Sequence, residues 1–273
     1  MMLFEQILPI LLPLILTGLL SGFLAGLLGV GGGIVIVPFL SYLLEVSAIH
    51  TTTPMHVSIA SSLAIIVPTS VFSARAHYRL GNVDGAVIKR LGPFVFLGAL
   101  GGAVVADGFD NSDLKVIFGA LAVLIGIPFM MRAIVLRDGL PLMMGRAILG
   151  SAIGLISALV GIGGGSLTVP SLVSCGWDMR RAVGTSALMG LVISIPGMIS
   201  FMIVGYGAAP DLPLASGYVW WPAVVIIASA AYVTTKSGAK FSNKIAQAKL
   251  RRIFGVFLII VGTKLIYNGM IGP

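Results

Sequence analysis

Residues 26–38 read GLLGVGGGIVIVP, and a close copy, VGIGGGSLTVP, stands at residues 160–170. In both stretches three consecutive glycines follow an apolar run, and each stretch ends in Val-Pro. Glycine runs interrupt helices, and lipid offers the freed backbone groups no hydrogen-bond partner. Each break must therefore be satisfied by protein or by a water-filled cavity. Two such breaks in matching positions of two halves indicate the binding site of a transporter.

The composition excludes most soluble proteins. Of the 273 residues, 58% are hydrophobic and only 10% are charged, whereas soluble domains carry about 25% charged residues. We therefore expect an integral membrane protein whose main partner is the lipid bilayer. Apolar runs of roughly 20 residues favour helices over a barrel of short alternating strands. The net charge of +8 does not indicate a nucleic-acid partner, because the basic residues stand in short loops between apolar runs.

Two smaller features concern processing of the chain. The single cysteine, Cys175, allows no intrachain disulfide. The first Lys or Arg in the chain is Arg75. The N-terminus therefore lacks the basic region of a cleaved signal peptide, and we expect the first apolar run to be retained as a span.

The apolar runs predict ten membrane-embedded helices. They cover residues 7–29, 34–44, 56–77, 88–107, 114–134, 147–161, 166–176, 183–205, 218–236 and 250–269. The second and seventh have about eleven residues each, which gives roughly 16 Å, about half of the ~30 Å hydrocarbon core. Because these half-length helices begin at the glycine clusters, the clusters are expected near the middle of the membrane.

The two halves of the chain match beyond the glycines. LKVIFG at residues 114–119 corresponds to LRRIFG at 250–255, and Pro68 corresponds to Pro196. The sequence therefore predicts an internal repeat of five helices, and an odd number of helices inverts the second copy in the membrane. The predicted units are residues 1–135, a cytoplasmic linker at 136–146, and residues 147–273.

The charged residues predict the orientation. If the N-terminus lies outside and the spans alternate, fifteen of the seventeen Lys and Arg residues fall in cytoplasmic loops, and only Lys115 and Lys264 do not. The outer loops then hold Glu5, Glu45, Asp107, Asp110, Asp113 and Asp211. We therefore place both termini outside the cytoplasmic (inner) membrane. The same charges fit hairpins that cross fully and hairpins that re-enter, for segments one and two and for segments six and seven.

The glycine clusters form the first candidate binding site. The residues assigned to it are Gly31, Gly32, Gly33, Ile34, Gly163, Gly164, Gly165 and Ser166. The short helices begin directly after the glycines, so their first N–H groups lack intrahelical acceptors and carry the positive end of the helix dipole. Such an end binds anions, and glycine lets a ligand approach the backbone. Tight packing of helices through small residues is the alternative explanation of these glycines.

Hydroxyl residues at the start of the third and eighth helices form the second candidate set. They are Ser58, Ser61, Ser62, Thr185 and Ser186. Pro68 and Pro196 fall near the membrane midplane and are expected to kink their helices, with Ser70 and Ser194 close by. The alternative role of each hydroxyl is a bond to the backbone of its own helix or of a neighbouring helix.

Few ionisable residues stand in the apolar runs. His56 is a candidate for a proton relay, but a solvated position at the membrane interface is the preferred interpretation. Arg75 is a candidate for gathering anions at a cytoplasmic mouth, with topology control as its preferred role. We expect Lys264 to reach toward the outer surface, and the aromatic residues at 218–221 to anchor the membrane interface.

The glycine stretches at residues 29–38 and 161–170 resemble those of the sulfite exporter TauE/SafE family. AVGTS at residues 182–186 is similar to the family's Gly-Thr-Ser segment, whereas the first half has HVS at residues 56–58. The resemblance covers nearly the whole chain. It implies a secondary carrier of two repeats that moves small sulfur-containing anions, such as sulfite or organosulfonates, across the cytoplasmic membrane, usually outward.

The main functional hypothesis is alternating-access export of a small sulfur-containing oxyanion. A channel-like anion pore and a carrier of another small organic anion are the alternatives. An intramembrane enzyme built from His56 and a nearby serine is disfavoured, because no buried acid orients the histidine. We expect no catalytic residues, cofactor or metal site. A proton or a sodium ion is a candidate for coupling, and the residues define no oligomeric state.

Overall fold

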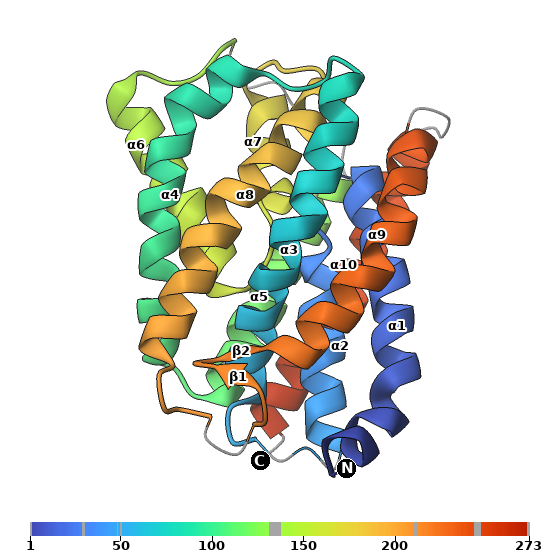
Figure 1. The fold of residues 1–273 in the computed structure, drawn as a ribbon. Coiled ribbons are helices and arrows are strands. Elements are labelled where there is room, and N and C mark those ends of the chain that lie inside the picture. The colour runs from blue at the N-terminus through green and yellow to red at the C-terminus, as the bar shows by residue number, and fades with distance from the viewer. Residues whose placement is uncertain are drawn as a thin grey trace.

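The computed structural model describes residues 2–28, 31–47, 49, 51–130, 138–209, 212–242 and 247–271. Within these residues the chain forms ten helices and one two-stranded hairpin (Figure 1). The helices are α1 (Met2–Leu28), α2 (Gly33–Val46), α3 (Pro54–Arg79), α4 (Gly85–Asp107), α5 (Asn111–Met130), α6 (Met143–Leu159), α7 (Gly165–Ser174), α8 (Met179–Val204), α9 (Trp221–Ser242) and α10 (Gln247–Ile271). The hairpin pairs β1 (Ala215–Ser216) with β2 (Val219–Trp220). The prediction of an all-helical bundle of about ten helices is confirmed.

The ninth helix begins later than its apolar run predicts. Gly217 has φ 57°, a left-handed conformation that suits glycine, and it forms a tight turn between Ser216 and Val219, which pair across the hairpin. A side-chain carbon built on Gly217 would collide with the carbonyl oxygen of Met202. The prediction of helix at residues 218–220 is therefore wrong, because the turn stands inside a continuous apolar run.

Length and composition identify the helices that can cross a membrane. Among the described residues, five apolar windows are long enough to span: Leu8–Leu27, Pro54–Arg79, Gly85–Asp107, Asn111–Pro128 and Met179–Val204. Large apolar side chains such as Leu12, Val104 and Ile203 stay more than half exposed on the outside of the bundle. Such a surface is stable in contact with lipid rather than water. The protein is a multi-pass membrane protein.

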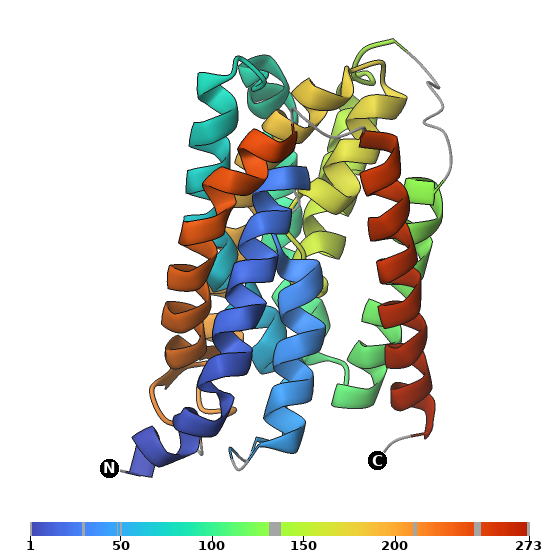
Figure 2. The same ribbon diagram turned by 90° about the vertical axis from the view of Figure 1, so that its right-hand side faces the viewer.

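Two helices are the shortest of those described. α2 has 14 residues and α7 has 10. α2 runs from the middle of the bundle to the end that carries both termini, whereas α7 runs from the middle to the opposite end (Figures 1 and 2). The prediction of two short helices that begin at the glycine clusters is confirmed.

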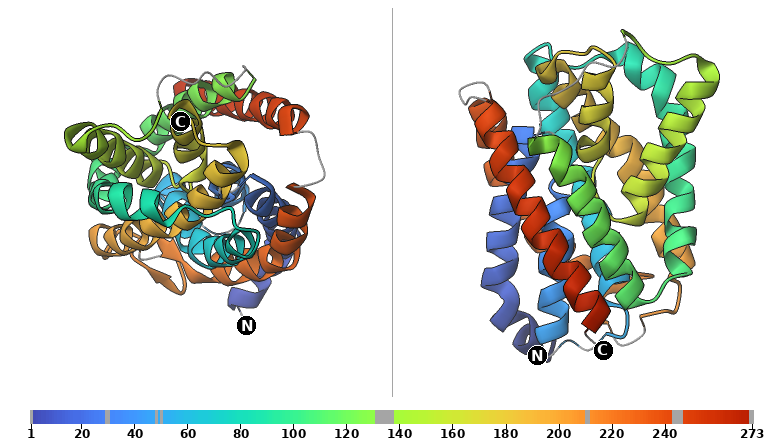
Figure 3. Two further views of the ribbon diagram at one scale, coloured as in Figure 1. Left: turned by 90° about the horizontal axis from the view of Figure 1, so that it is seen from above. Right: turned by 180° about the vertical axis from the view of Figure 1, so that it is seen from behind.

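Helix packing relates the two halves of the chain. α1 packs against α9 and α4 against α6, while α3 packs against α8 and α5 against α10 (Figure 3). Exchanging helices α1 to α5 with helices α6 to α10 converts the first pair into the second and leaves the other two pairs unchanged. This pairing is what a five-helix repeat requires. The inversion of the second repeat stays a prediction.

Small residues set the close approach of the paired helices. A side-chain carbon built on Gly22 of α1 would collide with the carbonyl oxygen of Ala231 on α9, and one built on Gly154 of α6 would collide with that of Val95 on α4. Packing of this kind is common between helices in membranes. The packing explanation therefore applies to these glycines within the long helices.

The charged side chains separate along the bundle. Apart from Lys115 and Lys264, the basic residues of the described chain gather where α3 and α9 end and where α4, α6, α8 and α10 begin, opposite both termini (Figures 1 and 2). Glu45, Asp107, Asp110 and Asp113 stand at the terminus-bearing end. The side of the membrane that each end faces stays a prediction. Five residues that support the predicted repeat and orientation lie outside the described residues. They are Gly29, Arg132, Arg137, Asp211 and Lys244.

Candidate functional site

The two glycine clusters touch each other inside the bundle. We call them the glycine tips (residues 31–33 and 161–165). Gly31 and Gly32 have φ 76° and 78°, which turns the chain sharply before α2 begins. A side-chain carbon built on Gly31 would lie only 3.2 Å from the Cα atom of Gly163, and one built on Gly33 would collide with the carbonyl oxygen of Gly161. Backbones can approach this closely only because these residues have no side chains.

Helix α3 fixes the tips from one side. The Ser62 hydroxyl donates a hydrogen bond of 2.8 Å to the carbonyl oxygen of Gly161. The side chain of Ile66, one turn further along α3, lies 3.1 Å from a side-chain carbon built on Gly31. Ser62, a predicted site residue, therefore satisfies a backbone group that the break in the second half has freed.

Helix α8 closes the other side of the second tip. A side-chain carbon built on Gly164 would lie 3.3 Å from both the Gly190 nitrogen and the Thr168 hydroxyl oxygen. One built on Gly190 would collide with the Ser70 hydroxyl oxygen. The Thr168 hydroxyl of α7 and, through Gly190, the Ser70 hydroxyl of α3 therefore both lie near the start of α7.

Four buried hydroxyls in this region have no partner. Within the described part of the chain, the side-chain oxygens of Ser70, Ser166, Thr168 and Ser194 accept and donate no hydrogen bond. All four residues are at most 1% exposed. Leaving a polar group buried and unbonded costs about 1–3 kcal/mol. Ser166 and Thr168 belong to the first turn of α7, and Ser70 lies against Gly190, which packs beside Gly164, so these three hydroxyls mark a place suited to a polar ligand. We call the side chains of Ser70, Ser166 and Thr168 the hydroxyl cluster.

The other predicted hydroxyls have structural partners. Ser58 bonds to the carbonyl of Pro54 at 2.6 Å, and Ser186 bonds to that of Val183 at 2.8 Å, each within its own helix. Ser61 accepts a bond of 2.9 Å from the backbone N–H of Trp220. These three hydroxyls make the backbone bonds that the alternative explanation predicts, and their role in binding substrate stays a prediction.

Two hydrogen bonds of the same kind fasten the connectors of the two halves. Asp84, the residue before α4, donates its backbone N–H to the Thr185 hydroxyl on α8 at 2.9 Å. Trp220, the residue before α9, donates its N–H to Ser61 on α3 at the same distance. Each half therefore holds the connector of the other through a hydroxyl. We call these contacts the α4 latch and the α9 latch, and they lie at opposite ends of the bundle (Figure 1).

The α4 latch has further partners. The Asp84 carboxylate accepts bonds from the N–H groups of Ala86 and Val87 and caps α4. It also accepts a bond of 3.1 Å from the Trp177 indole N–H and lies 3.6 Å from the Arg181 guanidinium. The Trp177 bond, with the two backbone bonds and Arg181, lowers the pKa of Asp84.

The α9 latch is built around the hairpin. Tyr218 donates a bond of 3.0 Å to the Asp107 carboxylate, and its ring stacks on His56 with the ring centroids 4.9 Å apart. Burial and the Asp107 contact raise the pKa of Tyr218 to about 12, so the hydroxyl stays a donor at neutral pH. Trp220 is fully buried. The prediction that the aromatic residues at 218–221 anchor the membrane interface is therefore wrong for Tyr218 and Trp220.

His56 is buried rather than solvated. It is 4% exposed, and its Nε2 atom lies 3.1 Å from the carbonyl oxygen of Ala106. The preferred interpretation of a solvated histidine is wrong, because the hairpin covers its ring. Its hydrogen bond goes to the backbone and not to Ser58 or Ser61, so these residues do not form a nucleophile–base pair. The relay role stays a prediction.

The remaining predicted residues lie as follows. Ile34 is buried in the first turn of α2. α3 and α8 continue through Pro68 and Pro196, so neither proline ends its helix. Arg75 is exposed near the basic end of α3. Within the described residues, no group of three His, Cys, Asp or Glu side chains gathers to hold a metal ion.

Comparison with known proteins identifies the family. A family model described as sulfite exporter TauE/SafE matches residues 14–265. The chain belongs to this family. A probable membrane transporter protein of Haemophilus influenzae is 35% identical over 240 residues, which cover 86% of this chain and 90% of the relative. The probable membrane transporter protein YunE of Bacillus subtilis is 30% identical over 269 residues, which cover 89% and 93%.

No solved structure matches the chain. Family membership and these relatives agree with the apolar spans, and the protein is a membrane transporter. The resemblance to the TauE/SafE family rests on the two glycine stretches and on AVGTS at residues 182–186. The structure brings the two glycine stretches together, whereas Thr185 of AVGTS lies in the α4 latch.

Proposed function

We propose that this TauE/SafE protein is an alternating-access carrier of a small sulfur-containing oxyanion, of the sulfite or organosulfonate type, and that it exports this anion across the cytoplasmic membrane. One observation carries the proposal: the buried, unpartnered hydroxyls of Ser70, Ser166 and Thr168 lie in or beside the first turn of α7, where the glycine tips meet. Family membership supports the substrate class, since the family is described as sulfite exporters.

The proposed site recognises an oxyanion by hydrogen-bond donors. The first N–H groups of α7 precede any intrahelical acceptor and carry positive partial charge. Ser70, Ser166 and Thr168 add hydroxyl donors. A hydrogen bond to a charged group is worth about 1.5–3 kcal/mol, so a few of them offset the loss of hydration of a small anion. The first turn of α2, at Gly33 and Ile34, faces the same meeting point in the proposal.

The glycine tips and the latches supply the proposed transport cycle. With Gly31 against Gly163 and both latches bonded, the conformation is interpreted as occluded. Release of the α9 latch would open the terminus-bearing end, and release of the α4 latch would open the basic end. Alternation between the two moves the access route around a fixed site.

A substitution at the tip tests the placement of the site. Gly164→Leu puts a side chain between α7 and Gly190, so we expect uptake of radiolabelled sulfite into proteoliposomes to be lost while the protein stays folded. Gly101→Leu is the matched control, because a side-chain carbon there meets nothing closer than 3.7 Å. Unchanged uptake by folded Gly164→Leu would refute the site.

A rate measurement tests the carrier mechanism. A carrier saturates with substrate because each cycle needs a conformational change, whereas a pore conducts continuously. We expect saturable sulfite uptake and no single-channel currents in planar bilayers. Currents that persist in Gly164→Leu would contradict both the carrier and its site.

A further inference from the structure

The two basic residues that stand apart from the basic end of the bundle share one cavity. Lys115 on α5 and Lys264 on α10 both line a cavity of about 290 Å³ between α2, α5 and α10. Its polar lining also includes Ser41, Glu45 and Asn268. The excess of Lys and Arg in cytoplasmic loops accounts for the other basic residues. It does not account for Lys115 and Lys264 at the terminus-bearing end, so these two need a local explanation.

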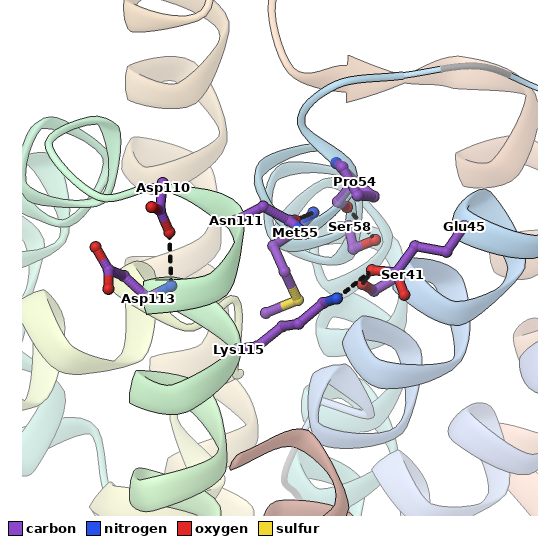
Figure 4. Close-up of polar contacts among 9 residues, drawn as sticks. All are labelled: Ser41, Glu45, Pro54, Met55, Ser58, Asp110, Asn111, Asp113 and Lys115. Carbon is purple, nitrogen blue, oxygen red and sulfur yellow. Dashed lines mark hydrogen bonds and ion pairs between the residues drawn. The ribbon is translucent and has the colours of Figure 1, made fainter. Parts of the chain in front are cut away.

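One of the two lysines is neutralised. The Lys115 Nζ atom lies 2.9 Å from Glu45 Oε1, and its side chain is 7% exposed. Ser41 donates a bond of 3.3 Å to the same carboxylate oxygen. Figure 4 shows Lys115 pointing toward Glu45, with Asp110 and Asp113 on the other side of α5. This pair leaves little positive charge on Lys115 for a ligand.

The second lysine keeps its charge. Within the described part of the chain, the ion pairs are those of Lys115 and Arg181, and neither involves Lys264. The Lys264 Nζ atom lies 5.5 Å from the centre of the Tyr42 ring. With Lys115 and Glu45 paired, the cavity has a net charge of +1 that Lys264 carries.

The cavity opens on the surface that faces lipid. Its lining includes Phe39, Tyr42 and Ile260, which are 42%, 54% and 62% exposed. Phe39 and Tyr42 belong to α2 and Ile260 to α10, two neighbouring helices that can be followed in Figure 2. A cavity on this surface meets the acyl chains and headgroups of the bilayer rather than bulk solvent.

The depth of the cavity suits a headgroup. Lys264 lies seven residues before the end of α10, and Tyr42 lies four residues before the end of α2. At 1.5 Å per residue these positions are about 10 Å and about 6 Å from the helix ends. Lys side chains at this depth reach to the headgroup level.

We propose that this cavity binds the headgroup of an anionic phospholipid. Its phosphate accepts hydrogen bonds from the Lys264 ammonium and the Asn268 amide, and its acyl chain lies against Phe39, Ile260 and Val261. A choline headgroup is disfavoured, because its own positive charge leaves no net attraction to a cavity of charge +1. This site goes beyond the proposed transport function and is separate from the glycine tips.

Native mass spectrometry of the full chain in detergent tests the proposal without a transport assay. We expect dioleoylphosphatidylglycerol to be retained and dioleoylphosphatidylcholine to be lost at equal concentration. Lys264→Gln is expected to reduce retention of the first phosphatidylglycerol molecule about tenfold, which corresponds to the loss of about 1.4 kcal/mol. Lys264→Arg should restore it, and Lys236→Gln, on the exposed end of α9, is the matched control.

Four outcomes would overturn the proposal. The first is equal retention of the two lipids, and the second is retention by Lys264→Gln equal to that of the unchanged protein. The third is displacement of the lipid by inorganic phosphate at millimolar concentration, which would show a site for a free anion. A lipid-free dimer that Lys264→Gln disrupts would also overturn it, because a second copy would then cover this face.

Discussion

Two serines on α3 have opposite relations to their surroundings. Ser62 donates to the Gly161 carbonyl, whereas the Ser70 hydroxyl is buried without a partner. We expect Ser62→Ala to lower the free energy of unfolding by about 1–3 kcal/mol, because it leaves a buried carbonyl unbonded. Ser70→Ala is expected to leave stability unchanged or higher. If Ser70 binds the proposed oxyanion, this variant should also weaken sulfite transport roughly tenfold or more, because a hydrogen bond to a charged group is lost.

Thermal unfolding in detergent and the substrate concentration at half-maximal uptake check the two variants together. Each serine is the control for the other, since both lie on the same helix and are buried. Equal loss of stability in the two variants would contradict the distinction. So would an unchanged substrate dependence in Ser70→Ala.

The sequence pointed to hydroxyl residues of α3 and α8, but their individual hydrogen-bond partners could not be predicted from it. Ser70 and Ser194 could be placed near the midplane from their distance to Pro68 and Pro196. Ser61 and Thr185 were predicted to bind substrate, but each bonds to a connector more than 100 residues away in the chain. Gly190 carries no local signal at all, because its role depends on α7 packing against it.

The connector before α4 gives a prediction about pH. The pKa of Asp84 is lowered in the folded protein, mainly by the bond from Trp177. A lowered pKa stabilises the fold at pH values above the ordinary value of 3.8, and this stabilisation is lost as the pH falls through the lowered pKa. Asp84→Ala is expected to cost about 0.5–2 kcal/mol at neutral pH, because α4 loses its N-cap.

Thermal unfolding between about pH 3 and pH 7 measures this effect. The stability gap between the unchanged protein and Asp84→Ala should be constant near neutral pH and should narrow as Asp84 takes up a proton. Trp177→Phe removes the largest cause of the lowered pKa, so in that background the gap should narrow less as the pH falls. A gap that is independent of pH over this range would contradict the role of the carboxylate.

Helices were easier to predict than the segments that join them. The ten helices follow from apolar composition and length, and the two short ones follow from the glycines that precede them. The hairpin at residues 215–220 was missed because its strands have two residues each and stand in an apolar run. Its turn at Gly217 fits against Met202 of α8, and no pattern near Gly217 in the sequence indicates that contact.

The arrangement of the whole bundle gives physical meaning to the repeat in the sequence. Matching helices form matching pairs, and the residues before α4 and α9 are held by hydroxyls on α8 and α3. Neither relation requires the halves to share many identical residues. Both halves have glycines where the backbones of the glycine tips touch. The hydroxyl of one latch is a serine, Ser61, and that of the other is a threonine, Thr185, in a different local sequence. The glycines therefore make the repeat visible in the sequence. Most contacts between the two halves of the chain could not be predicted from it.

The separation of charge along the bundle predicts its orientation in the membrane. Tyr206 and Leu142 are 89% and 84% exposed, and they lie at the terminus-bearing end and the basic end. In a Cys175→Ser background, a membrane-impermeant maleimide should label Tyr206→Cys in intact cells and should not label Leu142→Cys. After permeabilisation both should react. The expected result follows because basic loops are retained in the cytoplasm.

The reverse labelling pattern would place the basic end outside and would invert every statement about direction. The background substitution changes the side-chain volume little at the buried Cys175. Orientation also decides which latch faces the cytoplasm. If Leu142→Cys is protected in intact cells, the α4 latch is the cytoplasmic one, and export requires it to open before the α9 latch in each cycle.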